Sequence, residues 1–180
     1  MATREIGLVA ASCLLLGLAG AAWGAERFGI GRPATEAEIA AWNIDIDRDG
    51  LKLPPGRGSV THGREIFAAQ CASCHGATGE GGLGERLAGG RGTLASAKPV
   101  KTVGSFWPYA PTLFDYIRRA MPMNAPQSLS DDDVYAVSGY VLHLNGLAPG
   151  DAVFDARSLA AIRMPNRDGF VPDPRPDVRP

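Results

Sequence analysis

The spacing of apolar residues along the chain predicts three main helices separated by irregular segments. Residues 59–70 carry Ile66 and Phe67 on one helical face, and this helix runs directly into residue 71. Residues 112–120 have a similar apolar face and end on two arginines, where a helix favours positive charge. A third helix is predicted to begin after Ser130, with three aspartates in its first turn, and to end at Gly146.

The segments around these helices favour loops. The chain has 23 glycines and 14 prolines, with glycines concentrated after residue 75 and prolines near the C-terminus. Thr35 and Glu38 form a capping box that predicts one short helix ending near residue 42. We therefore expect a domain at residues 59–146, an irregular extension at residues 26–58, and a proline-rich extension at residues 147–180 that wraps the surface.

The first 25 residues have the pattern of a leader. Residues 6–23 are apolar or small throughout and follow a short start that carries Arg4. Small residues at positions 24 and 25 suit cleavage, so we interpret residues 1–25 as a secretory signal peptide. The alternative is an uncleaved membrane anchor, because the run approaches the ~20 residues that span a bilayer. Cleavage would leave a periplasmic protein without a membrane span.

Composition excludes several classes of protein. The chain has 180 residues, of which 45% are hydrophobic and 21% charged, so a globular core is expected. Its net charge of −1 argues against a nucleic-acid partner, which would usually require a basic excess. Three cysteines are too few for a small disulfide scaffold.

Cys71, Cys74 and His75 form the sequence C-x-x-C-H, the attachment signature of c-type haem. Two thiols at this spacing share one face of a helical turn and reach both vinyl groups of the porphyrin, while the following imidazole lies under the iron. A thioredoxin-like pair would need a βαβ context, and a zinc site would need two further ligands, with Cys13 in the leader. One motif predicts one covalent haem c. Pro99 or a neighbouring carbonyl is expected to orient the imidazole.

The second iron ligand has several candidates. Met121 follows the second predicted helix, and Met123 and Met164 carry the same thioether. His62 and His143 lie within the first and third predicted helices, where an exposed or structural role is the ordinary expectation. For each methionine, the alternative role is packing around the cofactor.

The order of haem motif, Met121-Pro122 and closing helix resembles the class I cytochromes c over residues 59–146. In that family the methionine of a Met-Pro pair binds the iron, so the resemblance assigns Met121 as the second metal ligand. It also implies that Gly63 and Phe67 meet Tyr140 where the first and last helices cross. The expected fold class is therefore all-α, a small class I cytochrome c fold with three main helices around one haem.

A closer resemblance also extends to segments outside this core. The segments that carry it are residues 31–34 (GRPA), 42–46 (WNIDI), 89–94 (GGRGTL), 98–110 (KPVKTVGSFWPYA), 114–122 (FDYIRRAMP) and 164–170 (MPNRDGF). They are similar to the cytochrome subunit of bacterial sulfane dehydrogenase, which partners a molybdenum protein in periplasmic sulfur oxidation. That subunit is longer and carries a second haem region. We therefore expect a single-haem branch that serves a sulfane, a sulfite or another molybdenum dehydrogenase.

The resemblance implies an electron-transfer subunit and not an enzyme by itself. A molybdenum dehydrogenase subunit would donate electrons, and another cytochrome c or a terminal oxidase would accept them. Two alternatives remain open at this point. One is a free soluble carrier that delivers electrons to a terminal oxidase, and the other is an enzyme or sensor with an open haem site.

Charge is uneven along the chain despite its small net value. Residues 86–119 hold six basic residues against a single acid, Asp115. If this stretch rings the haem edge, it would steer an acidic redox partner; the alternative is an ordinary solvated loop. Trp107 or Tyr109 in this stretch would either hydrogen-bond a haem propionate or only pack.

Overall fold

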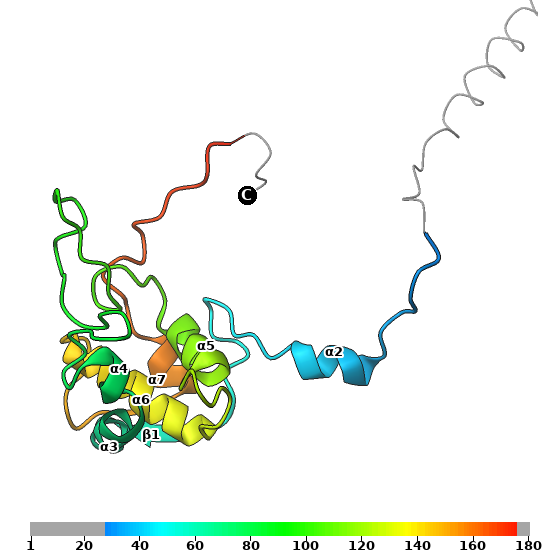
Figure 1. Cartoon of the computed structure of the whole chain (residues 1–180), viewed down its shortest axis with the longest axis horizontal. Coiled ribbons are helices and arrows are strands. Elements are labelled where there is room, and N and C mark those ends of the chain that lie inside the picture. Colours follow the sequence, from blue (N-terminus) through cyan, green and yellow to red (C-terminus); the bar gives the residue numbers. More distant parts are fainter. Residues whose placement is uncertain (1–27, 176–180) are drawn as a thin grey trace, which may run out of the picture. The chain divides into compact units, whose positions relative to one another are not determined.

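The computed structural model describes residues 28–175 in two units, one ending at Ile39 and the other beginning at Ala40 (Figure 1). The predicted signal peptide lies outside the described residues. Within residues 28–175, no helix combines the length and apolar character needed to cross a bilayer.

Helix α2 (Glu36–Trp42) begins at the capping box that the sequence predicts. The backbone amide of Glu38 donates to the Thr35 hydroxyl at 3.3 Å, and the Thr35 amide donates to the Glu38 carboxylate at 2.8 Å. Arg32 also pairs with this carboxylate. The Arg32 guanidinium, together with the bonds from Thr35, lowers the pKa of Glu38 to about 2. The short helix is therefore fixed by local polar contacts.

Three helices form the core of the second unit: α3 (Val60–Gln70), α5 (Ala110–Ala120) and α6 (Asp131–Leu144). Helices α3 and α5 both pack on α6, which is buried along its whole middle (Figure 1). Ser59 and Ser130 cap α3 and α6 by accepting amide hydrogen bonds. The mostly helical fold that the sequence predicts is confirmed.

The crossing of α3 and α6 depends on a glycine. A Cβ at Gly63 would lie 2.0 Å from the carbonyl oxygen of Ala136, so only glycine lets the two backbones approach this closely. One turn along, Phe67 and Tyr140 meet edge to face with ring centroids 5.3 Å apart. This is the contact that the cytochrome resemblance predicts.

Helix α5 starts two residues earlier than the apolar pattern predicts. The helix begins at Ala110, and Pro111 occupies its first turn. Proline is well tolerated there because its missing N–H would have no helical acceptor. Phe114 packs on Tyr135 of α6 with ring centroids 4.5 Å apart, which joins α5 to the core.

The segment after α6 returns to the core, although we expected residues 147–180 to wrap the surface. Strand β2 (Val153–Asp155) pairs antiparallel with β1 (Arg57–Ser59), and helix α7 (Ala156–Ala160) follows. Leu159 and Met164 are 0% and 2% exposed. Isolated apolar residues in a proline-rich stretch carry no periodic signal, so only the tertiary structure reveals that they are buried.

Candidate haem-binding site

Helix α3 delivers the C-x-x-C-H motif at its C-terminal end. Cys71 caps α3, donating its amide to the carbonyl of Phe67 at 2.9 Å, and leads into the single turn α4 (Ala72–His75). The amides of Cys74 and His75 both donate to the Cys71 carbonyl, at 3.1 and 3.0 Å. The motif is therefore helical, and its two thiols are free and half-buried.

The two cysteines differ from a reactive redox pair. Burial raises the pKa of the Cys71 thiol to about 11, and the neighbouring Cys74 adds to this effect. Thioredoxin-like pairs instead lower the pKa of one cysteine to make a thiolate nucleophile. Burial of Cys71 therefore favours the neutral thiol over a reactive thiolate.

The ring of His75 is held by a backbone carbonyl. Its Nδ1 lies 2.7 Å from the carbonyl oxygen of Glu85, which can only accept, so Nδ1 carries the proton and Nε2 keeps its lone pair. Gly84 lies against the ring, where a Cβ would be 2.9 Å from Cε1. The sequence predicts that either Pro99 or a nearby carbonyl orients His75. In the structure a carbonyl, that of Glu85, has this role.

The loop that presents Glu85 is tied to the end of α6. The carbonyl of Gly79 accepts from the amide of Leu87 at 2.9 Å. The Asn145 side chain then bridges the loop, accepting from the Gly89 amide at 3.1 Å and donating to the Leu87 carbonyl at 3.0 Å. The sequence pattern does not single out Asn145; its only signal is its place at the end of the third predicted helix.

The methionine candidates lie in different surroundings. Met121 directly follows α5 and packs, partly buried, against the edge of the core. Met123 is 78% exposed, and Met164 is buried near α7. Of the three methionines, Met121 is therefore the one that is partly buried and packs against the core.

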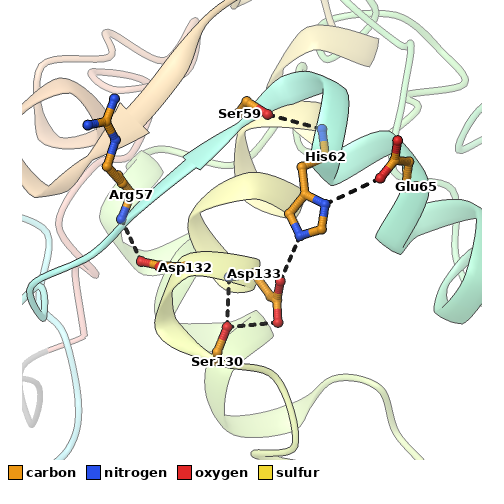
Figure 2. Close-up of polar contacts among 7 residues, drawn as sticks. All are labelled: Arg57, Ser59, His62, Glu65, Ser130, Asp132 and Asp133. Atoms are coloured by element: carbon orange, nitrogen blue, oxygen red, sulfur yellow. Dashed lines mark hydrogen bonds and ion pairs between the residues drawn. The ribbon is translucent and has the colours of Figure 1, made fainter.

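The two other histidines make structural contacts. Nε2 of His62 lies 3.0 Å from a carboxylate oxygen of Asp133, and its Nδ1 lies 3.4 Å from Glu65 (Figure 2). Nδ1 of His143 lies 2.9 Å from the carbonyl of Ala148, to which it donates. His62 is exposed and His143 is partly buried and hydrogen-bonded, as the sequence predicts, and the contact of His62 with Asp133 is additional.

Trp107 and Tyr109, the two aromatic residues considered for a haem propionate, have contacts within the protein. The indole N–H of Trp107 donates to the Thr112 hydroxyl at 3.0 Å, and the ring meets Tyr116 edge to face at 5.8 Å. Arg167 lies over the Tyr109 ring at 5.1 Å. Packing and internal hydrogen bonding therefore account for Trp107.

These residues fit a covalently attached haem. The helical turn offers two thiols and one imidazole with a free Nε2. Partly buried apolar side chains, among them Leu87, Trp107, Met121 and Leu144, pack against the core of the same unit. The combination supplies attachment, one nitrogen ligand, a candidate sulfur ligand and apolar side chains for a haem.

Comparison with known proteins agrees with this geometry. Residues 58–141 match the family described as cytochrome c oxidase, cbb3-type, subunit III. The crystal structure of the sulfane dehydrogenase SoxCD from Paracoccus pantotrophus aligns with a TM-score of 0.76 and 45% identity, over 83% of this chain and 74% of that chain. The helical motif and these matches show that the chain belongs to the cytochrome c family. Within that family it resembles a chain of the sulfane dehydrogenase SoxCD.

Curated relatives are also sulfur-compound dehydrogenases. The thiosulfate dehydrogenase of Allochromatium vinosum is 29% identical over 69% of this chain and 42% of its own length. Those of Psychrobacter arcticus and Stutzerimonas stutzeri are 31% and 32% identical, over 26% and 28% of their lengths. The chain therefore spans less than half the length of these curated relatives.

Proposed function

We propose that this protein is a periplasmic mono-haem cytochrome c that accepts single electrons within a molybdenum-dependent dehydrogenase of sulfane or sulfite compounds. The observation that carries this proposal is the helical C-x-x-C-H turn with the His75 ring held by the Glu85 carbonyl. The 45% identity to the sulfane dehydrogenase structure supports the sulfur substrate class.

Each site residue has a defined task in this proposal. Cys71 and Cys74 would hold the porphyrin covalently, and Nε2 of His75 would ligate the iron. Met121 would supply the sulfur ligand, because it is the partly buried methionine that follows α5. A haem held by these residues would supply a one-electron couple, and His/Met ligation favours a higher potential than bis-His ligation. The Glu85 carbonyl keeps the His75 ring in one orientation.

The proposal assigns residues 1–25 to a signal peptide and residues 59–146 to the cytochrome domain. A molybdenum-containing subunit donates electrons, and another cytochrome c or a terminal oxidase accepts them. The match to the sulfane dehydrogenase supports a stable partner, since it covers 83% of this chain and so extends well beyond residues 58–141. Segments outside the cytochrome domain are thus shared with that relative.

The experiment is a gentle purification of the haem protein from its native periplasm. Molybdenum and iron are measured in the same fraction, and sulfite, thiosulfate and a sulfane compound are each tested as reductants of the haem. We expect molybdenum at about one per haem, with at least one of the three compounds reducing it. Iron without molybdenum would contradict the subunit role and leave a free carrier as the function.

A further inference from the structure

Some of the basic residues at positions 86–119 form ion pairs with carboxylates, and others do not. Arg118 pairs with Asp131 at 2.9 Å, and Arg119 pairs with Asp115 at 2.5 Å. The first pair joins α5 to α6 and the second lies within α5, so both arginines already have carboxylate partners. What remains of the stretch lies in the long loop before α5.

That loop contains no acidic residue between positions 86 and 107. Arg91, Lys98 and Lys101 are all exposed on it, and none has a carboxylate partner among residues 28–175. Figure 1 shows this loop, in green, extending away from the helices. The loop therefore carries three exposed positive charges that have no carboxylate partner among the described residues.

Buried hydroxyl groups make the loop a fixed structure although it has no helix or strand. The Thr93 hydroxyl donates to the Gly90 carbonyl at 2.6 Å and accepts from the Val100 amide at 3.0 Å. The hydroxyl of Ser105 donates to the Val100 carbonyl, and that of Thr102 to the Gly89 carbonyl, both at 2.6 Å. A loop pinned in this way loses little conformational entropy when a partner binds.

The loop and the C-terminal segment together enclose a shallow hollow of about 380 Å³. Its lining residues are Leu94, Ala95, Pro99, Lys101, Phe106, Asn166, Gly169 and Phe170. Phe106 and Phe170 meet edge to face at 5.3 Å, and Asn166 donates to the Phe106 carbonyl at 2.8 Å, which joins the two walls. Lys101, whose amine lies 5.0 Å from the centre of the Phe106 ring, is the one charged residue of the lining.

Acidic groups of the neighbouring segment do not neutralise this surface. Asp168 pairs with Arg163 at 2.7 Å, and Asp173 pairs with Arg175 at 2.6 Å. Each carboxylate is matched within its own segment. The loop charge is therefore available to a partner molecule.

We propose that residues 91–101 and this hollow form the docking site for a redox partner protein that presents an apolar side chain flanked by carboxylates. The apolar side chain enters the hollow, and the carboxylates meet Arg91, Lys98 and Lys101. The loop joins the haem site directly, because the Val103 amide donates to the carbonyl of Leu87, two residues after Glu85. This docking site rests on the proposed electron-transfer function and specifies the surface chemistry of the protein that exchanges electrons with the haem.

The experiment follows amide resonances of the reduced holoprotein during titration with a capped peptide, Glu-Asp-Phe-Asp-Glu. We expect shifts concentrated at residues 93–101 and Phe170, with binding that weakens as salt rises. Lys101→Glu and Arg91→Glu should each weaken binding at least five-fold. Arg64→Glu, an equal charge change on the exposed face of α3, should leave binding within two-fold. An unchanged haem spectrum checks that each variant is folded.

Several results would overturn the docking site. One is that the loop variants bind the peptide as tightly as Arg64→Glu does. Another is that millimolar peptide shifts no amide resonance, or shifts only resonances outside the loop and hollow. If a peptide with serine in place of phenylalanine binds equally well, the hollow does not receive the apolar side chain. Perturbation of the loop by anionic phospholipid vesicles but not by peptide would assign it to a membrane surface instead. Because the peptide test needs neither molybdenum nor a sulfur substrate, its failure is distinguishable from failure of the proposed function.

Discussion

At the scale of single residues, the site is ordered by backbone groups as much as by side chains. The Glu85 carbonyl sets the tautomer of His75, and any residue at position 85 would supply the same carbonyl. Gly84 leaves room for the imidazole because it has no side chain. The sequence motif therefore identifies His75 as a ligand. The groups that orient its ring depend on the path of the loop through Gly84 and Glu85.

The identity of the second iron ligand gives a prediction at this scale. Replacing Met121 with alanine should abolish the sulfur-to-iron charge-transfer band at the red end of the oxidised spectrum, because the thioether at the partly buried core edge is lost. Met123→Ala is the matched control, since Met123 is 78% exposed, and it should keep the band. A band that survives in Met121→Ala would assign the ligand role to another residue.

At the scale of elements, polar contacts join the starts of α3 and α6 beside their close crossing. His62 on α3 contacts Asp133 on α6, while Ser130 donates to the same carboxylate and Arg57 donates its amide to Asp132 (Figure 2). Burial would raise the pKa of Asp133, but the hydrogen bonds from Ser130 and His62 outweigh it and lower that pKa. The carboxylate is therefore ionised at neutral pH and favours a protonated His62.

The His62 contact predicts a pH dependence of stability. The hydrogen bonds to Asp133 and then Glu65 raise the pKa of His62 above that of the unfolded chain. The stabilisation is thus fully present below the unfolded pKa of about 6.5 and is lost as pH rises through the folded pKa. Because His62 is half-exposed, we expect less than about 1 kcal/mol.

The measurement is urea unfolding of the protein and of His62→Gln at pH 5.5 and pH 8.5. The difference in unfolding free energy between the two should be larger at the lower pH. Arg64→Gln, a nearby exposed change on the same helix, should show no such dependence. A difference that is the same at both pH values would show that His62 is not an ion-pair partner in solution.

At the scale of the whole molecule, residues far apart in sequence complete one core. Gly58 in β1 lies opposite Phe154 in β2, and Ile46 donates its amide to the buried carboxylate of Asp115 at 2.9 Å. Leu159 is fully buried although it lies after the last main helix. The segments flanking the three helices are therefore part of the folded unit from which the haem motif is presented.

This arrangement predicts that the segment after α6 contributes to stability. Leu159→Ala should lower the unfolding free energy by about 2–5 kcal/mol, because it leaves a cavity in a closed core. Val153→Ala, at a site 46% exposed, should cost less than about 1 kcal/mol. Denaturant unfolding of the holoprotein measures the unfolding free energy of both variants. If Leu159→Ala lowers it as little as Val153→Ala does, the segment after α6 only covers the surface.

Local spacing and capping in the sequence predict the three main helices and the helical C-x-x-C-H turn, because these depend on neighbouring residues. The Gly63–Phe67–Tyr140 crossing joins distant segments, and the sequence indicates it only through the resemblance to class I cytochromes c. The tertiary structure decided the Glu85 acceptor, the Asn145 bridge, the burial of Leu159, and the sorting of paired from unpaired cations. Each of these depends on a contact between distant segments, and no local pattern of polarity encodes such a contact.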